Sequence, residues 1–291
     1  MSKSAGSKSV QLVAIALIML VVGVAVGYSY GQSQIPPPKP ATTVTVTATP
    51  PKRVTLLEKI KQRGQIIVGT SADYPPYEFI DDKTKRPAGL DIEIVEAIAK
   101  EIGVTVKWED MPFESLIGAL DAGKIDMIAA GMGLKATRIE KLAYSIPYQE
   151  SSTNVLVVKK ESSVKPFTDL AEAGKLKLKV GVQTGTIQES IMLGLVSDGK
   201  AQKENIISYI NVDLMMNDLV AGRIDTAMID KPVADSWAKR IPLSIIYSQW
   251  APPKCLWLLK GERELLDAVD MAMLKLHEKG VIQELLSKWL G

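Results

Sequence analysis

From Gly89 to Ile102 the chain reads GLDIEIVEAIAKEI. The apolar residues in this stretch recur at helical spacing, and the charged residues between them point to other faces. The apolar face carries Ile92, Val95, Ile98, Ala99 and Ile102. Asp91 can cap the first turn, and Gly103 suits the left-handed conformation that ends many helices. We therefore predict an amphipathic helix that packs one face on a core.

Short β-branched runs alternate with helical patterns on both sides of this helix. Such alternation is typical of α/β proteins whose sheets have parallel neighbours. The predicted elements are helices over Leu56–Arg63 and Phe113–Ala122, and strands over Gln65–Thr70, Val104–Trp108 and Met127–Ala130. The chain closes with a helix over Glu262–Lys279 and a shorter one that begins at Val281. The predicted fold class is therefore α/β.

The sequence also contains an internal repeat. The segment LDAGKID at Leu120–Asp126 is echoed by LVAGRID at Leu219–Asp225. In each copy a helix would end at a glycine, and a basic–Ile–Asp triplet would lead into a strand. A weaker echo pairs Val68–Ser71 with Val180–Gln183. Both echoes are separated by roughly 100 residues, the size of a small domain, which indicates two similar α/β lobes.

The composition argues against several kinds of function. The formal net charge is only +2, so we do not expect nucleic acid as a partner. Cys255 is the only cysteine, which excludes an internal disulfide and a cysteine metal site. His277 is the only histidine, and no nucleophile motif accompanies it. We therefore expect no metal, no cofactor and no catalytic residue, in a protein that acts as a monomer.

The N-terminus differs in kind from the rest of the chain. Lys3 and Lys8 precede an uncharged apolar run from Leu12 to Tyr28, which approaches the ~20 residues needed to cross a bilayer. We expect residues 1–31 to form a cytoplasmic flank and an uncleaved signal-anchor transmembrane helix, with a cleaved signal peptide as the alternative. Residues 32–53 are rich in proline and threonine and should form an extended stalk. The globular domain would then be extracytoplasmic, tethered to the cell membrane by a single-pass anchor.

The predicted helix that begins after Gly89 carries a motif as well. A glycine, a large apolar residue and two acids that flank an apolar residue lead into it, as Gly89-Leu90-Asp91-Ile92-Glu93. This string resembles the signature of the extracellular solute-binding proteins of family 3, which bind polar amino acids for ABC importers. The likeness covers the chain from about Val54 to Gly291.

The resemblance implies a two-lobed, periplasmic-binding-protein-like fold of type II. It would have two mixed sheets with helices on both faces, and a hinge of two crossovers near Gln149–Val155 and Ser248–Cys255. Lobe 1 would comprise residues 54–152 and 252–291, and lobe 2 residues 153–251. An amino acid would be captured in the interlobe cleft and delivered to the permease subunits of an ABC transporter.

Lobe 1 matches the family's ligand-binding positions at Ser71, Tyr74, Phe113, Gly131, Gly133 and Arg138. The resemblance implies that Arg138 clamps the ligand's α-carboxylate, since a guanidinium offers two parallel donors. Tyr74 and Phe113 would form aromatic walls, and Ser71 would read the ligand's side chain. Gly133 stands where the family carries serine or threonine, so only its backbone N–H could serve.

Lobe 2 contributes Gln183, Thr186, Ile187 and Asp230. The resemblance places the Thr186 hydroxyl on the carboxylate, although a simple helix N-cap favours the same residue type. Ile187 replaces a smaller residue and leaves its backbone N–H as the donor. Asp230 would hold the α-ammonium, or alternatively cap a helix ahead of Pro232. Arg138 and Asp230 would together recognise a zwitterion from opposite lobes.

Two other functions are compatible with such a fold. A cyclohexadienyl or arogenate dehydratase-like enzyme would need a general acid in the cleft, and nothing marks out Glu150 or Glu189 for that role. A sensor ectodomain would be followed by a second membrane segment and a signalling domain, which this sequence does not contain. The identity of the amino acid stays open. Ser71 replaces the acid common in binders of basic ligands, and no further cation for a dicarboxylate is evident.

Overall fold

The computed structural model describes residues 19, 20, 22, 24, 25, 31 and 54–291. The chain divides into two compact units, residues 1–52 and residues 53–291. The described positions of the first unit are helical. Most of the predicted membrane segment Leu12–Tyr28 and all of the predicted stalk at 32–53 lie outside the described residues. Among the described residues, no helix combines the length and apolar character that a membrane span requires.

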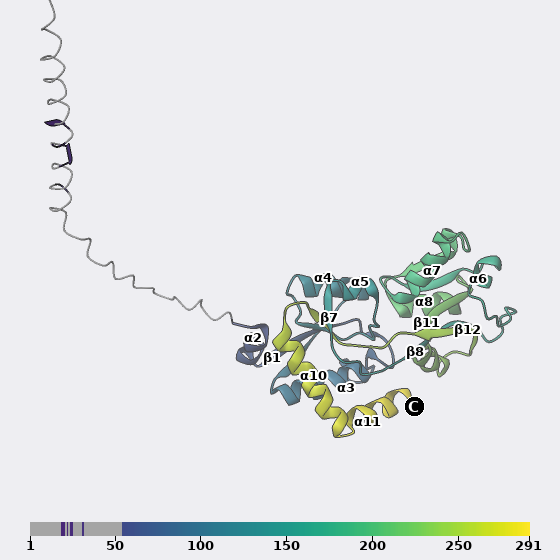
Figure 1. The fold of residues 1–291 in the computed structure, drawn as a ribbon. Coiled ribbons are helices and arrows are strands. Elements are labelled where there is room, and N and C mark those ends of the chain that lie inside the picture. The colour runs from purple at the N-terminus through teal and green to yellow at the C-terminus, as the bar shows by residue number, and fades with distance from the viewer. Residues whose placement is uncertain (1–18, 21, 23, 26–30, 32–53) are drawn as a thin grey trace, which may run out of the picture. The chain divides into compact units, whose positions relative to one another are not determined.

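The second unit is built on two five-stranded sheets, drawn side by side in Figure 1. Each combines parallel and antiparallel neighbours, so the predicted pair of mixed sheets is confirmed. We call the part around the first sheet the first lobe and the part around the second sheet the second lobe. The first sheet has the order β5 (Thr105–Asp110), β1 (Gln65–Thr70), β6 (Met127–Ile128), β13 (Trp257–Leu259) and β7 (Leu142–Tyr144). The second has the order β10 (Ile206–Tyr209), β9 (Val180–Gln183), β11 (Thr226–Asp230), β8 (Ser152–Lys159) and β12 (Leu243–Ala251).

A third, small sheet was not predicted. Its antiparallel strands are β2 (Asp73–Tyr74), β3 (Glu78–Ile80) and β4 (Pro87–Ala88). It follows β1 directly and leads into helix α3, Leu90–Ile102. These strands are too short to show a periodic pattern, because two or three residues cannot establish alternation.

Helix α3 lies where the sequence predicts it, but its first turn differs from the prediction. The N-cap is Gly89, which has a φ of 130° and an extended ψ. A Cβ added to Gly89 would lie only 2.2 Å from the Tyr77 carbonyl oxygen. The first N–H groups, of Leu90 and Asp91, donate to the carbonyls of Pro76 and Tyr77. Backbone carbonyls thus satisfy the helix start, and the predicted capping role of Asp91 is wrong. Its carboxylate is buried and accepts instead from Gly131 N at 2.7 Å.

The internal repeat corresponds to one packing arrangement that occurs in both lobes. A Cβ on Gly69 of β1 would lie 2.4 Å from Ile125 Cδ1, and one on Gly181 of β9 would lie 2.6 Å from Ile224 Cδ1. The isoleucine of each repeated triplet therefore packs directly over the glycine of a neighbouring strand. Each helix ends at a glycine of positive φ, Gly123 at 66° and Gly222 at 71°, as predicted.

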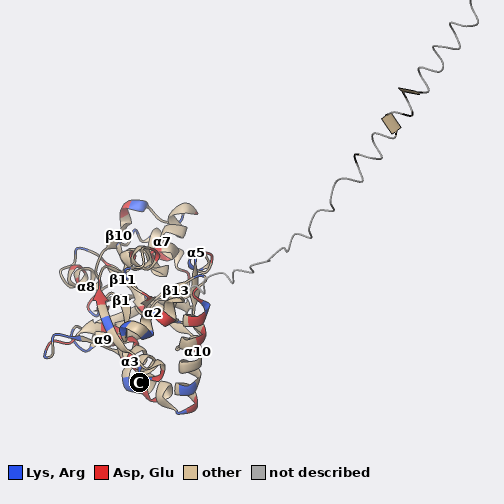
Figure 2. Cartoon of the chain, turned by 90° about the vertical axis from the view of Figure 1, so that its left-hand side faces the viewer, with Lys and Arg blue, Asp and Glu red and all other residues tan. Residues whose placement is uncertain are grey.

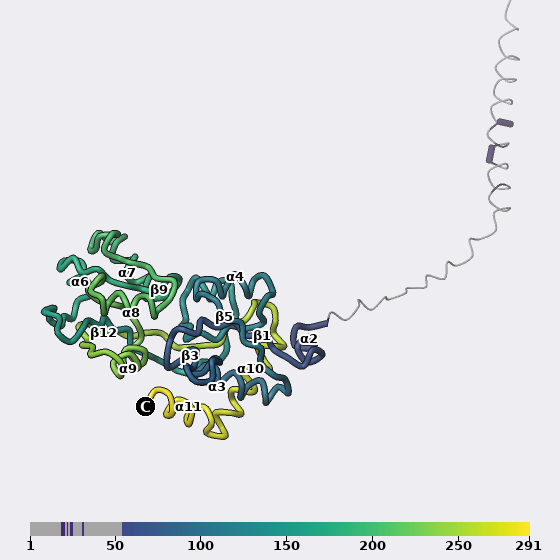
Figure 3. Tube along the Cα trace, turned by 180° about the vertical axis from the view of Figure 1, so that it is seen from behind, coloured from purple at the N-terminus to yellow at the C-terminus, as the bar shows by residue number. Residues whose placement is uncertain are grey.

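The remaining helices cover the two sheets, and the last two return to the first lobe. Helices α10 (Arg263–Glu278) and α11 (Val281–Leu290) pack against α3, and α10 also packs against α2 (Leu56–Arg63), as Figures 1 and 3 show. An ion pair between Lys288 of α11 and Glu93 of α3, at 2.7 Å, adds to this packing. Figure 2 shows that charged residues of both signs are interspersed over the described chain. The other helices are η1 (Phe113–Ser115), α4 (Leu116–Asp121), α5 (Ala136–Ile139), α6 (Ala171–Lys175), α7 (Ile187–Ser197), η2 (Lys203–Asn205), α8 (Val212–Val220) and α9 (Lys231–Ala238).

The chain passes between the two sheets twice. It leaves β7 of the first sheet and enters β8 of the second at Ser152, then leaves β12 at Ala251 and returns to β13. The ends of β8 and β12 pair antiparallel, with Ser152 opposite Ala251. Between β12 and β13, Lys254 forms isolated bridges with Gly133 and Gln149. Two adjacent crossing segments of this kind allow hinge motion between lobes.

Candidate functional site

A pocket lies between the two lobes, beside the crossing segments. Nine of its lining residues were predicted from the sequence as ligand-binding: Tyr74, Phe113, Gly131, Gly133, Arg138, Gln183, Thr186, Ile187 and Asp230. Six were not: Ala130, Asn154, Gln188, Ala251, Pro252 and Lys254. Ser71, the tenth predicted residue, is buried but does not line this pocket, and its hydroxyl has no hydrogen-bond partner.

Arg138 projects from the short helix α5 into the interlobe region. Its two terminal nitrogens donate to Gly133 O at 2.9 Å and to Gly185 O, in the second lobe, at 2.8 Å. The guanidinium also lies 5.4 Å from the centre of the Phe113 ring. Burial lowers the pKa of Arg138 to about 10, so the group stays charged at neutral pH. No ion pair of the described residues includes Arg138, which leaves a buried cation that an anionic group would stabilise.

Asp230 faces Arg138's pocket from the opposite lobe, at the end of β11. It is the N-cap residue of α9, yet its side chain makes no capping bond. Instead Oδ2 accepts from Tyr74 Oη at 2.9 Å, Lys254 Nζ at 2.7 Å and Gln188 Nε2 at 3.2 Å. Asp230 Oδ1 is buried without a partner. The carboxylate is therefore turned to the pocket rather than to the helix start.

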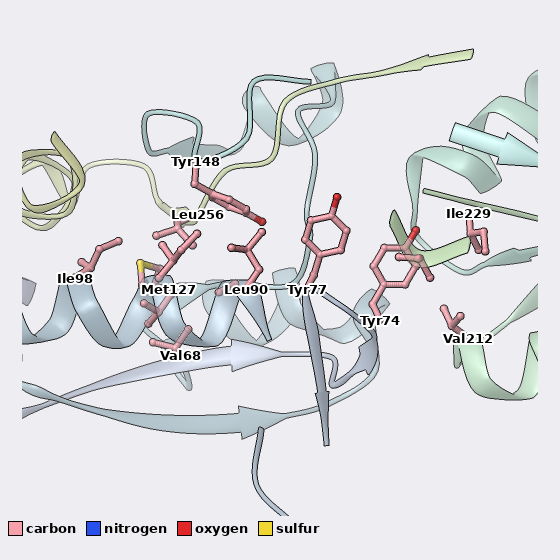
Figure 4. Packing of buried hydrophobic residues seen from close by; sticks show 14 of the residues in the cluster. Val68, Tyr74, Tyr77, Leu90, Ile98, Met127, Tyr148, Val212, Ile229 and Leu256 are labelled. Atoms are coloured by element: carbon pink, nitrogen blue, oxygen red, sulfur yellow. The ribbon is translucent and has the colours of Figure 1, made fainter. Parts of the chain in front are cut away.

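Tyr74 joins the lobes at this point. Besides donating to Asp230 Oδ2, its hydroxyl oxygen accepts from Asp230 N at 2.9 Å. Figure 4 shows the Tyr74 ring between Tyr77 on one side and Ile229 and Val212 of the second lobe on the other. The Tyr74 and Tyr77 rings are stacked, 6.0 Å between centres. The predicted aromatic wall is thus also a contact that holds the lobes together.

Lys254 is the one charged residue among the six lining residues that sequence reasoning missed. Its side chain is 5% exposed, and its Nζ lies 5.5 Å from the centre of the Tyr77 ring as well as beside Asp230. A signal was present in the sequence, because Lys254 is the one charged residue in the run from Trp250 to Leu259. Lysine is almost never fully buried unless it is paired, so a lone lysine in an apolar run indicates a buried partner.

The turn that follows β9 closes the pocket from the second lobe. Thr186 is the N-cap of α7, since its Oγ1 accepts from Glu189 N at 3.2 Å, and it donates to Gln183 O at 2.6 Å. Gln183 in turn donates through Nε2 to Asp73 Oδ2 of the first lobe at 2.9 Å. The capping alternative for Thr186 therefore holds in this structure, and Gln183 serves an interlobe contact.

The glycine at position 133 and the isoleucine at position 187 are matched in size. A Cβ on Gly133 would lie 3.0 Å from Ile187 Cδ1 and 3.4 Å from Pro252 Cγ. The side chain of Ile187 thus takes the space that a residue larger than glycine at 133 would need. Gly133 and Ile187 therefore fit together across the cleft.

Carboxyl groups lie beneath the pocket, in a layer that the sequence did not reveal. Glu78 is fully buried, neither of its oxygens has a partner, and burial raises its pKa well above its usual range. Burial raises the pKa of Asp91 to about 6, opposed by the hydrogen bond from Gly131 N. Burial also raises the pKa of Asp73 to about 7, opposed by the hydrogen bonds from Val212 N and Gln183. These groups therefore carry less negative charge at neutral pH than exposed carboxylates.

Comparisons with known proteins identify the family of the chain. Residues 66–291 match the model of the bacterial extracellular solute-binding proteins, family 3. The chain belongs to this family. The L-cystine-binding protein TcyJ of Escherichia coli K12 is 30% identical over 240 residues, which cover 81% of this chain and 86% of that protein. The arginine-binding extracellular protein ArtP of Bacillus subtilis is 30% identical over 231 residues, which cover 77% and 86% of the two chains.

Solved structures share the two-lobed fold. A mutant of the arginine-binding protein ArgBP from T. maritima superposes with a TM-score of 0.73 at 28% identity, over 80% of this chain and 98% of that chain. An ancestral amino acid-binding protein, described as a precursor of cyclohexadienyl dehydratase, gives a TM-score of 0.73 at 31% identity, over 81% and 99%. The predicted family and its periplasmic-binding-protein-like fold are thereby confirmed.

Proposed function

We propose that this protein is the binding component of an ABC importer and that it captures an amino acid between its lobes without transforming it. The observation that carries the proposal is that Arg138 and Asp230 line one pocket, each from a different lobe. The relatives named above are an L-cystine-binding and an arginine-binding protein. The solutes of these two relatives support an amino acid as the solute of this protein.

The chemistry of the pocket suits the main-chain groups of an amino acid. Arg138 is a charged, buried guanidinium without a carboxylate partner, and two parallel N–H donors fit a carboxylate. The backbone N–H of Ile187, at the start of α7, adds a donor at the positive end of a helix dipole. The ligand would then link Arg138 on the first lobe to Asp230 on the second. A solute that bonds to both lobes stabilises their closed arrangement.

The dehydratase alternative lacks a positioned general acid. Among the residues that line the pocket, Asp230 is the only carboxyl group, and it is paired with Lys254. Of the two acids considered from the sequence, Glu150 is exposed, and Glu189 accepts from Gly185 N and the Ser208 hydroxyl. The ancestral neighbour supports the same conclusion, because it is described as an amino acid-binding protein.

For the N-terminal segment we propose a single-pass membrane anchor, with the binding domain extracytoplasmic and monomeric. The support is the apolar run Leu12–Tyr28 behind two lysines and the proline-rich segment that follows it. Mass spectrometry of the membrane fraction tests this proposal. Recovery of the intact N-terminus is the expected result, and a soluble chain that begins near Gln32 would contradict it.

A thermal-shift screen of the full-length chain against the common L-amino acids tests the binding function. A ligand at about 100 times its Kd should add about 2.7 kcal/mol to the free energy of unfolding, which raises the melting temperature by several degrees. The D-enantiomer of any hit is the control, because the two charged anchors and the pocket wall that includes Tyr74 and Phe113 together give the three contacts needed to reject it. A screen in which no amino acid shifts the melting temperature would contradict the proposal.

A further inference from the structure

The proposed function assigns Asp230 to the ligand's ammonium group, but the protein already supplies an ammonium there. Lys254 Nζ lies 2.7 Å from Asp230 Oδ2, and the two side chains are 5% and 1% exposed. Tyr74 and Gln188 donate to the same oxygen. One oxygen of the carboxylate is therefore fully used by the protein's own donors, and its charge is neutralised by a buried cation.

Lys254 is fixed in this position. Its backbone N–H donates to Gln149 O at 2.9 Å, its carbonyl accepts from Tyr148 N at 3.1 Å, and it bridges to Gly133. Two other carboxyl groups, Glu78 and Asp91, interact electrostatically with Lys254. Glu78 favours its neutral form, and Asp91 is bonded to Gly131 N. Asp230 is thus the carboxylate that pairs with Lys254 directly.

What remains open in the pocket is a single acceptor. Asp230 lines the pocket, and its Oδ1 is buried and accepts no hydrogen bond. A second ammonium at Oδ1 would share one negative charge with Lys254, and like charges a few ångströms apart in a buried site repel strongly. A hydroxyl would supply the missing hydrogen bond without adding a charge.

We propose that Lys254 is a specificity-determining residue that stands in for the ligand's α-ammonium, so that the cleft accepts 2-hydroxy acids at least as well as the matching amino acids. This inference rests on the proposed function and specifies its ligand class. Arg138 holds the carboxylate of either ligand, and the 2-hydroxyl donates to Asp230 Oδ1. An amino acid binds only against the competing charge of Lys254.

Matched pairs test the proposal by calorimetry on the full-length chain. The probes are L-leucine with L-2-hydroxyisocaproate, L-phenylalanine with L-3-phenyllactate, L-glutamate with L-2-hydroxyglutarate and L-alanine with L-lactate. A carboxylate free to pair with an ammonium would favour the amino acid by about a hundredfold or more. For the pair that binds the wild type, we expect the hydroxy acid to bind at least as tightly as the amino acid. This ratio requires no variant.

Lys254→Met removes the charge and keeps an apolar side chain of similar length. We expect this change to shift the ratio toward the amino acid by about tenfold to a thousandfold, because Asp230 then lacks its internal cation. Lys254→Arg keeps the charge and should leave the preference for the hydroxy acid in place. Lys260→Met is the matched control, since it removes an exposed lysine outside the pocket.

The possible outcomes separate this inference from the proposed function. A wild type that binds the amino acid more tightly than the matching hydroxy acid overturns the role of Lys254 and leaves amino-acid binding intact. The role of Lys254 is also overturned if Lys254→Met weakens amino-acid binding more than hydroxy-acid binding. Lys254 would then assist the binding of the ammonium. A wild type that binds neither member of any pair overturns the proposed function itself.

Discussion

The two lobes share one scaffold and differ where they face each other. In each, a strand glycine, Gly69 or Gly181, lies under the isoleucine of the repeated triplet. In each, the aspartate that follows accepts a backbone N–H from the neighbouring strand or the residue just before it. Asp126 Oδ2 accepts from Ile67 N, and Asp225 Oδ2 from Lys179 N, both at 2.7 Å. The repeat is therefore a repeat of packing and backbone satisfaction.

The likeness ends six residues beyond each isoleucine, at Gly131 and Asp230. Gly131 presents no side chain and donates its N–H to Asp91, whereas Asp230 places a carboxylate in the pocket. A ligand with a positive and a negative end needs different groups on the two sides of a cleft. The comparison indicates that the scaffold is constrained by its own core and the cleft by the solute. Four experiments test it.

The largest effect should follow loss of a charged anchor on either side of the cleft. Arg138→Ala and Asp230→Ala should each weaken binding of the screened amino acid by about two to four powers of ten, since a charge-assisted bond is lost and a buried partner is left unpaired. Calorimetry measures both. If Arg138→Ala binds within about threefold of the wild type, the carboxylate lies elsewhere.

The shared scaffold should respond alike in both lobes. Gly69→Ala and Gly181→Ala each force a methyl group against an isoleucine Cδ1, so each should cost about 1–3 kcal/mol in the free energy of unfolding. Urea unfolding measures the loss. The double variants with Ile125→Val or Ile224→Val remove the opposing Cδ1 and should cost less than the sum of the single changes. Additive losses would mean that the glycines are not needed for close approach.

The aspartates of the two repeats should differ in magnitude. Asp126 is buried and also accepts from Arg63, whereas Asp225 is exposed. Asp126→Ala should therefore cost about 1–3 kcal/mol and Asp225→Ala less than about 1 kcal/mol in the free energy of unfolding. Equal losses in urea unfolding would show that burial does not distinguish the two.

The last effect concerns pH at the interlobe contact of Asp73. Its pKa is about 7 in the folded protein against an ordinary value of 3.8, so between these values the folded state binds more protons than the unfolded state. Stability should fall as pH rises, by at most about 1.4 kcal/mol per pH unit from this group, and level off above about pH 8. Asp91, at about 6, acts in the same direction at lower pH.

Asp73→Asn keeps an acceptor for Gln183 and Val212 and removes the titration. Urea unfolding at pH 5, 6, 7 and 8 should therefore show a flatter profile between pH 6 and 8 in this variant. A profile that matches that of the wild type would assign the pH dependence to other groups.

Local pattern was enough for much of the scaffold and for the main anchors of the site. The 3.6-residue period predicts α3 and α10, the repeated triplets predict two lobes, and the family motif leads to Tyr74, Arg138 and Asp230 in one pocket. These features are encoded locally, since each depends on a periodic face, a glycine cap or a short motif. The two- and three-residue strands of the third sheet escaped because they are too short to carry such a pattern.

Only the tertiary structure decided which partner each polar group has. Asp91 bonds to Gly131 because the carbonyls of Pro76 and Tyr77 already satisfy the start of its helix. Lys254 lies in the second crossing segment, 24 residues beyond Asp230 in the chain, and becomes the counter-ion of Asp230. A buried charge takes its meaning from whatever the fold brings within a few ångströms of it, and that distance has no representation in local sequence. The sequence alone therefore determined the lobes and their anchors, and the tertiary structure determined the charge that the cleft presents to its ligand.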